Sequence, residues 1–359
     1  MPRQIIIDTD PGQDDAVAIL LALASPEDVD VRGIVAVAGN VGLKQNALNA
    51  LKVVELSGRT DVPVFAGCDR PLKRKLVTAE HVHGVTGLDG PDLPDPHLQL
   101  RRQHGVDFIM ESLEAEAPGQ ITICALGPLT NVATVLTRAP HLAAKIKEIV
   151  LMGGAYFEGG NITPTAEFNF YVDPQAAEIV FRSGIAITQM PLDVTHQVLT
   201  TTGRLDRLRS LGNASGTAVS QMLGFSERFD LEKYQWAGAP LHDPCVIAWL
   251  IAIARYRALD WLQAARDAES RRCRHEQDLR DLAIPERGPE QSAVEREGLE
   301  RLNRCLRGLQ EEQRRSVLMA YYEGYSHSEL AQAMDAPLGT VKAWVRRGLA
   351  RLRACLEQP

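Results

Sequence analysis

Short apolar runs alternate with stretches of helical spacing along the first half of the chain. The runs are nearly continuous and end in polar or glycine residues, which is typical of strands in a parallel sheet covered on both faces. We predict strands at Ile5–Ile7, Gly33–Ala38, Ile121–Leu126, Ile149–Met152 and Ile185–Met190. Between them we predict helices at Asp15–Ala24, Leu43–Ser57, Leu129–Thr137 and Pro174–Phe181. The pattern indicates an α/β fold, an open and mostly parallel sheet with helices on both faces and ligands beyond the carboxyl ends of its strands.

From Leu299 onward the apolar positions follow helical spacing only, which indicates a separate all-α domain. We predict a helix-turn-helix made of a helix at Ser328–Met334, a turn at Asp335–Leu338 and a last helix at Gly339–Leu356. The residues expected in its core are Leu330, Ala333, Leu338, Val341 and Val345.

Charge is unevenly spread over the 359 residues, and this supports a division into two segments. Residues 1–253 hold 20 Lys and Arg against 29 Asp and Glu, whereas the remainder holds 19 against 17. Seven of the eight lysines precede residue 254, and later basic residues are almost all arginine. Because a single core rarely grows beyond about 250–300 residues, we expect two domains of different origin.

The cysteines and the longest apolar run restrict the kind of protein. Six cysteines lie far apart without a C-x-x-C pair, which favours reduced thiols over a disulfide framework or a zinc site. The longest apolar run, Cys245 to Ala254, is too short to cross a bilayer, and Met1–Arg3 does not resemble a signal peptide. We therefore expect a cytoplasmic protein with no membrane partner.

Acidic residues gather where the first predicted strand ends, in the sequence Asp8-Thr9-Asp10-Pro11-Gly12-Gln13-Asp14-Asp15. A single aspartate here could simply cap the following helix. Four carboxylates within eight residues repel one another, and a bound hard cation offsets that repulsion. Ca²⁺ tolerates irregular oxygen geometry better than Mg²⁺, so a calcium site is favoured over capping. A phosphatase with an aspartyl nucleophile also places D-x-D after a strand, but it does not explain the second pair, Asp14 and Asp15.

The stretch IIIDTDPGQDDAVAILLAL resembles the signature of the inosine-uridine-preferring nucleoside hydrolases. The resemblance runs from residue 3 to about 250, in the family's order, through the motifs VAGN, HVHGVTG, LGPLTN, VLMGGAY, EFNFYVDP and LHDPC. It implies calcium-dependent hydrolysis of the N-glycosidic bond of purine or pyrimidine ribonucleosides to ribose and free base. It also implies a hydrolase part that forms homo-oligomers when intact.

The resemblance implies a role for each matching residue. The Ca²⁺ ligands are Asp10, Asp15, Asp243 and the main-chain carbonyl of Leu126. Asp10 is also the base that takes a proton from metal-bound water, and His242 protonates the departing nucleobase. The residues expected to bind the substrate are Asp14, Asn40 and Asn169 at the ribose hydroxyls, Asn161 and Glu167 near the 5′-hydroxyl, and Met152 beside the sugar.

These assignments have simpler alternatives in the sequence. His242, which precedes Asp243-Pro244, could be a helix-entry residue with no proton to give. Glu167 could be a solvated surface acid and Asn40 a turn residue after Gly39. The histidines of the HVHGVTG motif, His81 and His83, are assigned no role.

The C-terminal stretch GYSHSELAQAMDAPLGTVKAWVRRGLARLRACL resembles the domain of extracytoplasmic-function sigma factors that reads the minus-35 promoter element. The resemblance implies promoter DNA and RNA polymerase as partners, with Thr340–Arg347 as the recognition helix in the major groove. The candidate DNA-binding residues are Thr340, Lys342, Arg346, Arg347, Arg351 and Arg353. On charge alone, the alternative is a solvated helix face.

Together these patterns predict four parts: a hydrolase-like domain at 1–250, a helical remnant of the sigma promoter-melting region at 251–283, a linker at 284–298 and a helix-turn-helix domain at 299–359. The helical remnant is recognised in Ala248–Ala265. Because the hydrolase fold of the family continues beyond this point, we expect exposed apolar surface and aggregation unless Ala248–Ala265 covers the gap. Two functions remain open: an active hydrolase that also binds promoter DNA, and a DNA-binding sigma-type module joined to an inert, truncated hydrolase.

Overall fold

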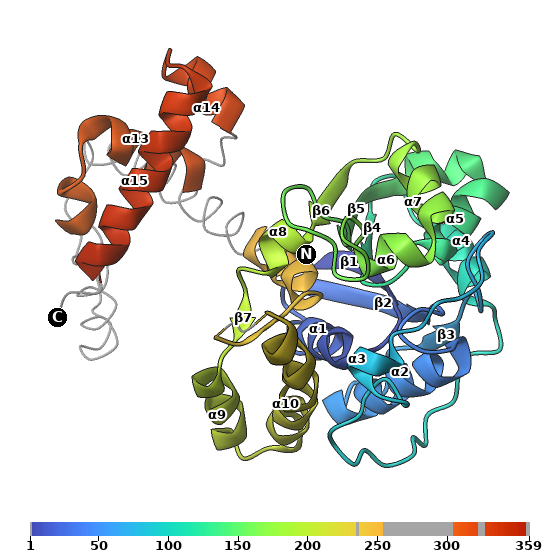
Figure 1. Cartoon of the computed structure of the whole chain (residues 1–359). Coiled ribbons are helices and arrows are strands. Elements are labelled where there is room, and N and C mark those ends of the chain that lie inside the picture. The colour runs from blue at the N-terminus through green and yellow to red at the C-terminus, as the bar shows by residue number, and fades with distance from the viewer. Residues whose placement is uncertain (1, 235–236, 254–303, 322–326, 357–359) are drawn as a thin grey trace, which may run out of the picture. The chain divides into compact units, whose positions relative to one another are not determined.

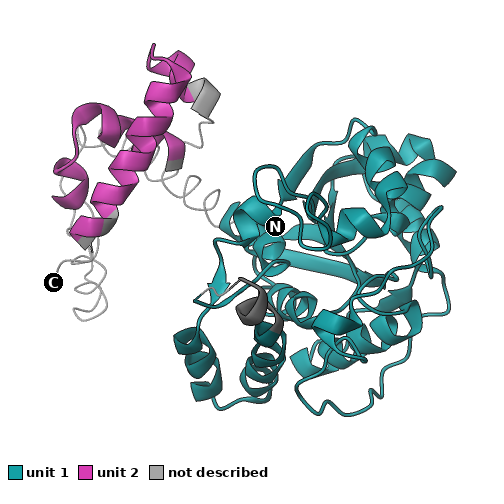
Figure 2. Ribbon diagram, viewed as in Figure 1, with its two compact units in different colours: residues 1–255 teal, residues 256–359 magenta. Residues whose placement is uncertain are grey.

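The computed structural model describes residues 2–234, 237–253, 304–321 and 327–356 (Figure 1). It divides into a first unit, Met1–Arg255, and a second unit, Tyr256–Pro359 (Figure 2). From residue 254 on, the predicted helical remnant and the linker lie outside the described residues. No helix within the described ranges is long and apolar enough to cross a membrane.

The first unit is built on a six-stranded sheet in which every pair of neighbouring strands is parallel, as predicted. The strand order is β3-β2-β1-β4-β5-β6. The strands are β1 (Arg3–Thr9), β2 (Val29–Ala36), β3 (Val64–Ala66), β4 (Ile121–Ala125), β5 (Ile146–Met152) and β6 (Ile187–Met190). A separate antiparallel pair joins β7 (Leu199–Thr200) to β8 (Ala239–Pro240).

Helices cover both faces of this sheet, as the ribbon shows (Figure 1). They are α1 (Gln13–Leu23), α2 (Leu43–Ser57), α3 (Glu80–His83), α4 (Gly105–Ala115), α5 (Thr130–Arg138), the 3₁₀ helix η1 (Pro140–Lys145), α6 (Phe168–Val172), α7 (Pro174–Phe181), α8 (Leu192–Thr195), α9 (Thr202–Ser210) and α10 (Ala214–Tyr234). Residues 244–253 are also helical.

The core explains why the first strand is apolar without interruption. Ile5 and Ile7 belong to one apolar cluster with residues of α1 and α2, whereas Ile6 belongs to a second cluster with residues of α4, α5 and α7. Successive side chains of a strand point to opposite faces, and here both faces are buried. The continuous apolar pattern therefore correctly predicted a covered parallel sheet.

Several elements differ from the prediction, among them β2 and α4. Strand β2 begins at Val29 rather than Gly33, because buried Val29 and Val31 alternate with exposed Asp30 and Arg32 and so form no continuous apolar run. Helix α4 was not predicted, although Val106, Ile109 and Leu113 are buried at helical spacing.

Strand β1 lies at the point where the strand order reverses. The chain adds β2 and β3 on one side of it and β4, β5 and β6 on the other. In open α/β sheets such a point leaves a crevice at the carboxyl ends of the two central strands. The acidic stretch that follows β1 and the loop that follows β4 both lie at this crevice.

The second unit holds α13 (Glu311–Tyr321), α14 (His327–Ala333) and α15 (Leu338–Leu356), around a core of Met319, Leu330, Val341 and Val345. Asp335, in the turn between α14 and α15, has a left-handed φ of 47°. Gly348 brings α15 close to α13, since a Cβ there would lie 2.7 Å from Val317 Cγ2. Ala333 and Leu338, predicted to be core, are exposed instead, because they flank the turn where the two helices diverge.

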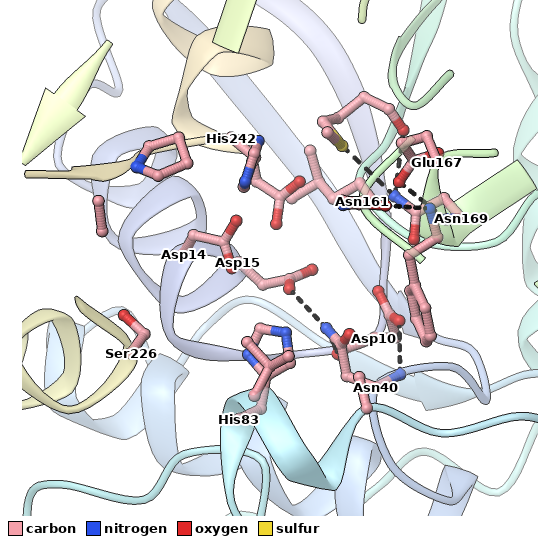
Figure 3. Close-up of a pocket in the computed structure, with 18 of the residues that line it drawn as sticks. Asp10, Asp14, Asp15, Asn40, His83, Asn161, Glu167, Asn169, Ser226 and His242 are labelled. Carbon is pink, nitrogen blue, oxygen red and sulfur yellow. Dashed lines mark hydrogen bonds between the residues drawn. The ribbon is translucent and has the colours of Figure 1, made fainter. Parts of the chain in front are cut away.

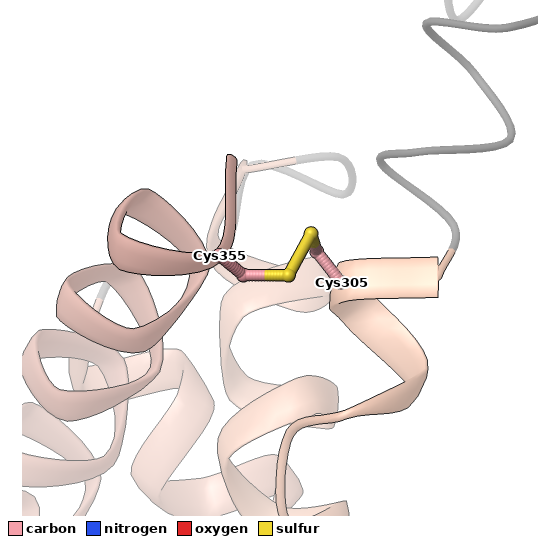
Figure 4. The surroundings of a disulfide bond; sticks show 2 residues. All are labelled: Cys305 and Cys355. Carbon is pink, nitrogen blue, oxygen red and sulfur yellow. A yellow bond between two sulfur atoms is a disulfide. The ribbon is translucent and has the colours of Figure 1, made fainter. Parts of the chain in front are cut away.

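A disulfide joins Cys305 to Cys355, near the two ends of the described part of the second unit (Figure 4). The prediction of reduced thiols is wrong for this pair, because the fold brings together two cysteines that are 50 positions apart in the chain. Cys68, Cys124 and Cys245 in the first unit are free, as expected.

Candidate functional site

A pocket opens at the carboxyl ends of the central strands of the first unit (Figure 3). Segments far apart in the sequence line it, from the loop after β1 to the residues just before helix 244–253. It gathers every residue predicted for the hydrolase site, namely Asp10, Asp14, Asp15, Asn40, Leu126, Met152, Asn161, Glu167, Asn169, His242 and Asp243.

Carboxylates dominate one side of this pocket. One carboxylate oxygen from each of Asp14, Asp15 and Asp243 lies within 4.8 Å of the other two. Asp10 lines the same pocket outside that trio. No lysine or arginine is among the described residues that line the pocket.

Two glycines leave room for the Asp10 carboxylate. A Cβ on Gly39 would lie 2.0 Å from one carboxylate oxygen of Asp10, and a Cβ on Gly127 would lie 2.2 Å from the other. The backbone N–H of Asn40 donates to Asp10 Oδ2 at 2.7 Å. Any larger residue at either glycine would therefore displace this side chain.

Asp15 is held by three donors at the start of α1. The Thr9 hydroxyl donates to Asp15 Oδ1, and the Gly12 backbone N–H donates to Oδ2 at 3.0 Å. The side-chain amide of Asn40 lies 3.3 Å from the same Oδ2 (Figure 3). Asn40 thus contacts both Asp10 and Asp15, which a turn residue alone would not do.

Burial and mutual repulsion raise the pKa of three of these carboxyl groups, those of Asp10, Asp15 and Asp243. Burial, then repulsion from Asp15, raises the pKa of Asp10 well above its usual value. Burial and repulsion from Asp14 raise the pKa of Asp15 to about 6, and the same two causes raise that of Asp243. A cluster of buried oxygen ligands without a basic residue fits a hard divalent cation, which would offset the repulsion.

Asn161, Glu167 and Asn169 line another side of the pocket (Figure 3). The Asn169 side-chain amide donates to the carbonyl oxygens of Leu126, at 2.8 Å, and Met152, at 3.2 Å. Asn161 Oδ1 accepts from the Phe168 backbone N–H at 2.8 Å. These hydrogen bonds fix the positions of the Asn161 and Asn169 side chains, each of which carries both donor and acceptor groups.

Glu167 is 2% exposed, so it is not a solvated surface acid. Its carboxylate accepts from the backbone N–H groups of Asn169, at 2.8 Å, and Gly154, at 2.8 Å. It caps the N-terminus of α6, and burial raises its pKa. Glu167 therefore both caps α6 and lines the pocket.

Histidines from segments that are distant in sequence also line the pocket. His81, His83, His196 and His242 all line the pocket. His242 Nδ1 lies 2.7 Å from the hydroxyl oxygen of Thr195, and burial lowers the pKa of His242 to about 4. His83 Nδ1 lies 2.6 Å from Gln13 Oε1. Although His242 closely precedes a helix, its ring belongs to the pocket.

Three histidines that line the pocket, His81, His83 and His196, were given no role by the prediction. Thr195, which is not among the residues that line the pocket, contacts His242. The Gly-rich HVHGVTG motif signalled His83, whereas no pattern marked Thr195-His196. Asp8 was expected to belong to the acidic cluster, but it does not line the pocket. Its carboxylate accepts a hydrogen bond from the Asn131 side-chain amide at 2.7 Å. Asp243, from far along the chain, is the carboxylate that joins the cluster in its place.

In the second unit, α15 presents the candidate DNA-binding residues. Lys342, Arg346, Arg347 and Arg351 are exposed and Thr340 is half-buried, while the side chain of Arg353 lies outside the described residues. Val341 and Val345 are buried on the other face of the helix. Arg351 differs from the others because it donates to Gln313 Oε1 of α13 at 3.2 Å.

Comparison with known proteins gives two family matches. Residues 5–300 match the family model described as inosine-uridine preferring nucleoside hydrolase. Residues 299–352 match the model described as sigma-70, region 4.

Individual relatives agree with the first match. The chain is 50% identical over 248 residues to an uncharacterized protein of Schizosaccharomyces pombe, covering 69% of this chain and 80% of that protein. It is 48% identical over 252 residues to the pyrimidine-specific ribonucleoside hydrolase RihA of Salmonella arizonae, covering 70% and 80%.

Solved structures show the same likeness. The purine-preferring ribonucleoside hydrolase of Gardnerella vaginalis is 33% identical with a TM-score of 0.67, covering 69% of this chain and 80% of that one. The plant nucleoside hydrolase PpNRh1 is 37% identical with a TM-score of 0.66, covering 70% and 79%. The chain therefore belongs to the inosine-uridine preferring nucleoside hydrolase family, and it carries a sigma-70 region 4 domain after its hydrolase unit.

Proposed function

We propose that the chain hydrolyses the N-glycosidic bond of purine and pyrimidine ribonucleosides with a bound Ca²⁺. One observation carries the proposal: Asp10, Asp14, Asp15, Asp243 and Glu167 line a single pocket that holds no lysine or arginine among its described residues and that also contains His242. A cation and a polyhydroxylated sugar would satisfy these acceptors, and an imidazole would face the leaving base.

The residues proposed to hold Ca²⁺ are Asp10, Asp15, Asp243 and the carbonyl oxygen of Leu126. Asp14 is proposed to accept a ribose hydroxyl, and the closeness of its carboxylate to Asp15 and Asp243 puts that hydroxyl next to the cation. When bound, the cation neutralises the carboxylates and lowers the pKa of water at the site.

The chain's own groups divide the reaction between two sides of the pocket. Asp10 takes a proton from the attacking water, which adds to C1′ of the ribose. The electron pair of the C1′–N bond passes to the base, and His242 gives that base a proton. Asn40, Asn161, Glu167 and Asn169 hold the ribose while positive charge develops at C1′.

Uridine is the first substrate to test. The relative named pyrimidine-specific is 48% identical to this chain, whereas the structure named purine-preferring is 33% identical. Both bases stay within the proposal, because the two relatives cover 70% and 69% of this chain.

The test is ribose release from uridine and inosine by the full-length chain, with a chelator and after addition of calcium. We expect turnover that the chelator abolishes and calcium restores. A chain that releases no ribose at saturating calcium would contradict the proposal and favour an inert hydrolase unit.

A second activity is supported by α15. We propose that the sigma-70 region 4 domain binds promoter DNA and RNA polymerase, with Lys342 and Arg346 reading base edges in the major groove. These two residues are exposed four positions apart, on a helix face turned by about 100° from buried Val341 and Val345. Gel-shift titration of minus-35 duplexes tests this, and equal affinity for all duplexes would reduce it to phosphate binding.

A further inference from the structure

A short helix that was given no role in the prediction contacts His242, the residue proposed to protonate the departing base. Helix α8 (Leu192–Thr195) follows β6 and ends at Thr195, whose side chain contacts His242. Thr195 is fully buried, and its hydroxyl oxygen lies 2.7 Å from Nδ1 of His242. Among the contacts described for the His242 ring, this is the one hydrogen bond.

Helix α8 is itself firmly held. The Asp193 carboxylate accepts from the backbone N–H groups of Tyr156 and Phe157, each at 2.8 Å. The backbone N–H of Leu192 donates to the Gly154 carbonyl at 2.9 Å. Because Leu192 and Asp193 both bond to the loop after β5, α8 holds Thr195 in a fixed position next to the His242 ring.

The two nitrogens of an imidazole have different surroundings here. Nδ1 faces Thr195, so Nε2 is the nitrogen available to the pocket that His242 lines. The partner of one ring nitrogen decides which nitrogen keeps its hydrogen. A hydroxyl oxygen that accepts from Nδ1–H keeps that hydrogen in place, and Nε2 then exchanges the second proton.

We propose that Thr195 is the positioning residue for His242, holding Nδ1–H so that Nε2 delivers the proton to the departing base; this rests on the function proposed above. In that step the C1′–N electron pair passes to the base, and the base nitrogen takes the proton from Nε2. Because the resting ring is neutral with its hydrogen on Nδ1, Nε2 takes a proton from the solvent before this step, and the ring returns to the neutral Nδ1–H form after it. Thr195 itself never touches the substrate.

The decisive experiment compares two leaving groups in the full-length, calcium-supplied chain. Uridine needs a proton on its departing base, whereas 4-nitrophenyl β-D-ribofuranoside releases a stable anion without one. Thr195→Val keeps the shape and removes the hydroxyl, and we expect it to lower kcat on uridine by roughly 10–100-fold, as for other positioning partners of functional histidines. Turnover of the nitrophenyl riboside should stay within about twofold, since general-acid help is not needed there.

Two further variants separate positioning from folding. Thr195→Ser keeps the hydroxyl and should restore most of the uridine rate. Thr122→Val is the matched control, because it removes another buried hydroxyl, one with no hydrogen-bond partner, from β4. It should leave both rates unchanged. Equal slowing of both substrates by Thr195→Val, or no slowing of either, overturns the proposal.

A measurement without turnover keeps the proposal distinct from the proposed function. In ¹⁵N-histidine NMR of the wild type, assigned with His242→Gln, we expect the neutral ring to carry its hydrogen on Nδ1. Thr195→Val should shift that signal toward a mixture of tautomers. A wild-type ring with its hydrogen on Nε2 overturns the proposal even if ribose is released, whereas an inactive chain with the Nδ1–H tautomer overturns only the proposed function.

Discussion

The two units of this chain use charged residues in opposite ways. In the hydrolase unit Asp10, Asp15 and Asp243 are buried at a sheet edge, where their repulsion requires a cation or protons. In the sigma-type unit Lys342 and Arg346 stay exposed on one helix face. The first arrangement needs distant segments to meet, whereas the second needs only helical periodicity.

The units also differ in how their cores are closed. The hydrolase unit has two apolar clusters, one on each face of its sheet. The sigma-type unit has a small cluster around Met319, Leu330, Val341 and Val345, and the Cys305–Cys355 disulfide ties together its ends. Small domains bury a smaller fraction of their surface and commonly depend on such covalent links.

The largest expected effect lies in the buried acidic cluster. Asp10→Ala removes both a cation ligand and the base, so we expect ribose release to fall by at least about 10⁴-fold. Asp61→Asn, at an exposed aspartate paired with Arg59, is the control and should keep full activity. Ribose release by Asp10→Ala close to the wild-type rate would remove Asp10 from the chemistry. DNA binding by the second unit should not change.

Reduction of the disulfide should affect only the other unit. The bond closes a loop of 50 positions, and loop-closure entropy predicts a loss of about 4 kcal/mol of stability when it is broken. Calorimetry of the full chain with and without a reductant should show one transition moving down. Cys305→Ser should reproduce the shift, and Cys68→Ser should not. A shift of the hydrolase transition instead would contradict the assignment of the bond to the small unit.

Calcium should stabilise the hydrolase unit alone. At a concentration 100 times its Kd, a ligand adds about 2.7 kcal/mol to the stability of the folded form. The raised pKa of Asp15, about 6, means that the calcium-free fold binds protons more tightly than the unfolded chain does. Its stability therefore falls as pH rises from about 4 to about 6, and the calcium effect on Tm should be larger at pH 8 than at pH 5. A Tm shift that is equal at both pH values would argue against carboxylate ligands.

The smallest effects concern single contacts of α15. Lys342→Ala or Arg346→Ala should cost about 1–3 kcal/mol and relax preference at one base position. Arg351→Ala should instead lower the log–log salt slope by about 0.9 without changing preference. Because Arg351 also bonds to Gln313, a Gln313→Ala control is needed to separate its DNA contact from helix packing. Loss of sequence preference in Arg351→Ala would reverse the assigned roles.

Local patterns carried much of the fold. The continuous apolar runs predicted β1, β4 and β5 because both faces of these strands are buried. The pattern missed the first half of β2, where burial alternates, and β3, which has only three residues. In the second unit the spacing of Leu330, Val341 and Val345 correctly predicted core positions, but Leu338 lies at an exposed helix start.

The sequence by itself determined the family, the parallel sheet and the candidate ligands, because motifs such as DTDPGQDD and LHDPC lie within short stretches of chain. Only the tertiary structure decided that Asp8 turns to Asn131 and that Asp14, rather than Asp10, lies closest to Asp15 and Asp243. It alone paired Cys305 with Cys355 and placed the Thr195 hydroxyl on His242. The reason is physical: a periodic pattern reports which face of its own element is buried, whereas a contact between distant elements depends on how those elements pack.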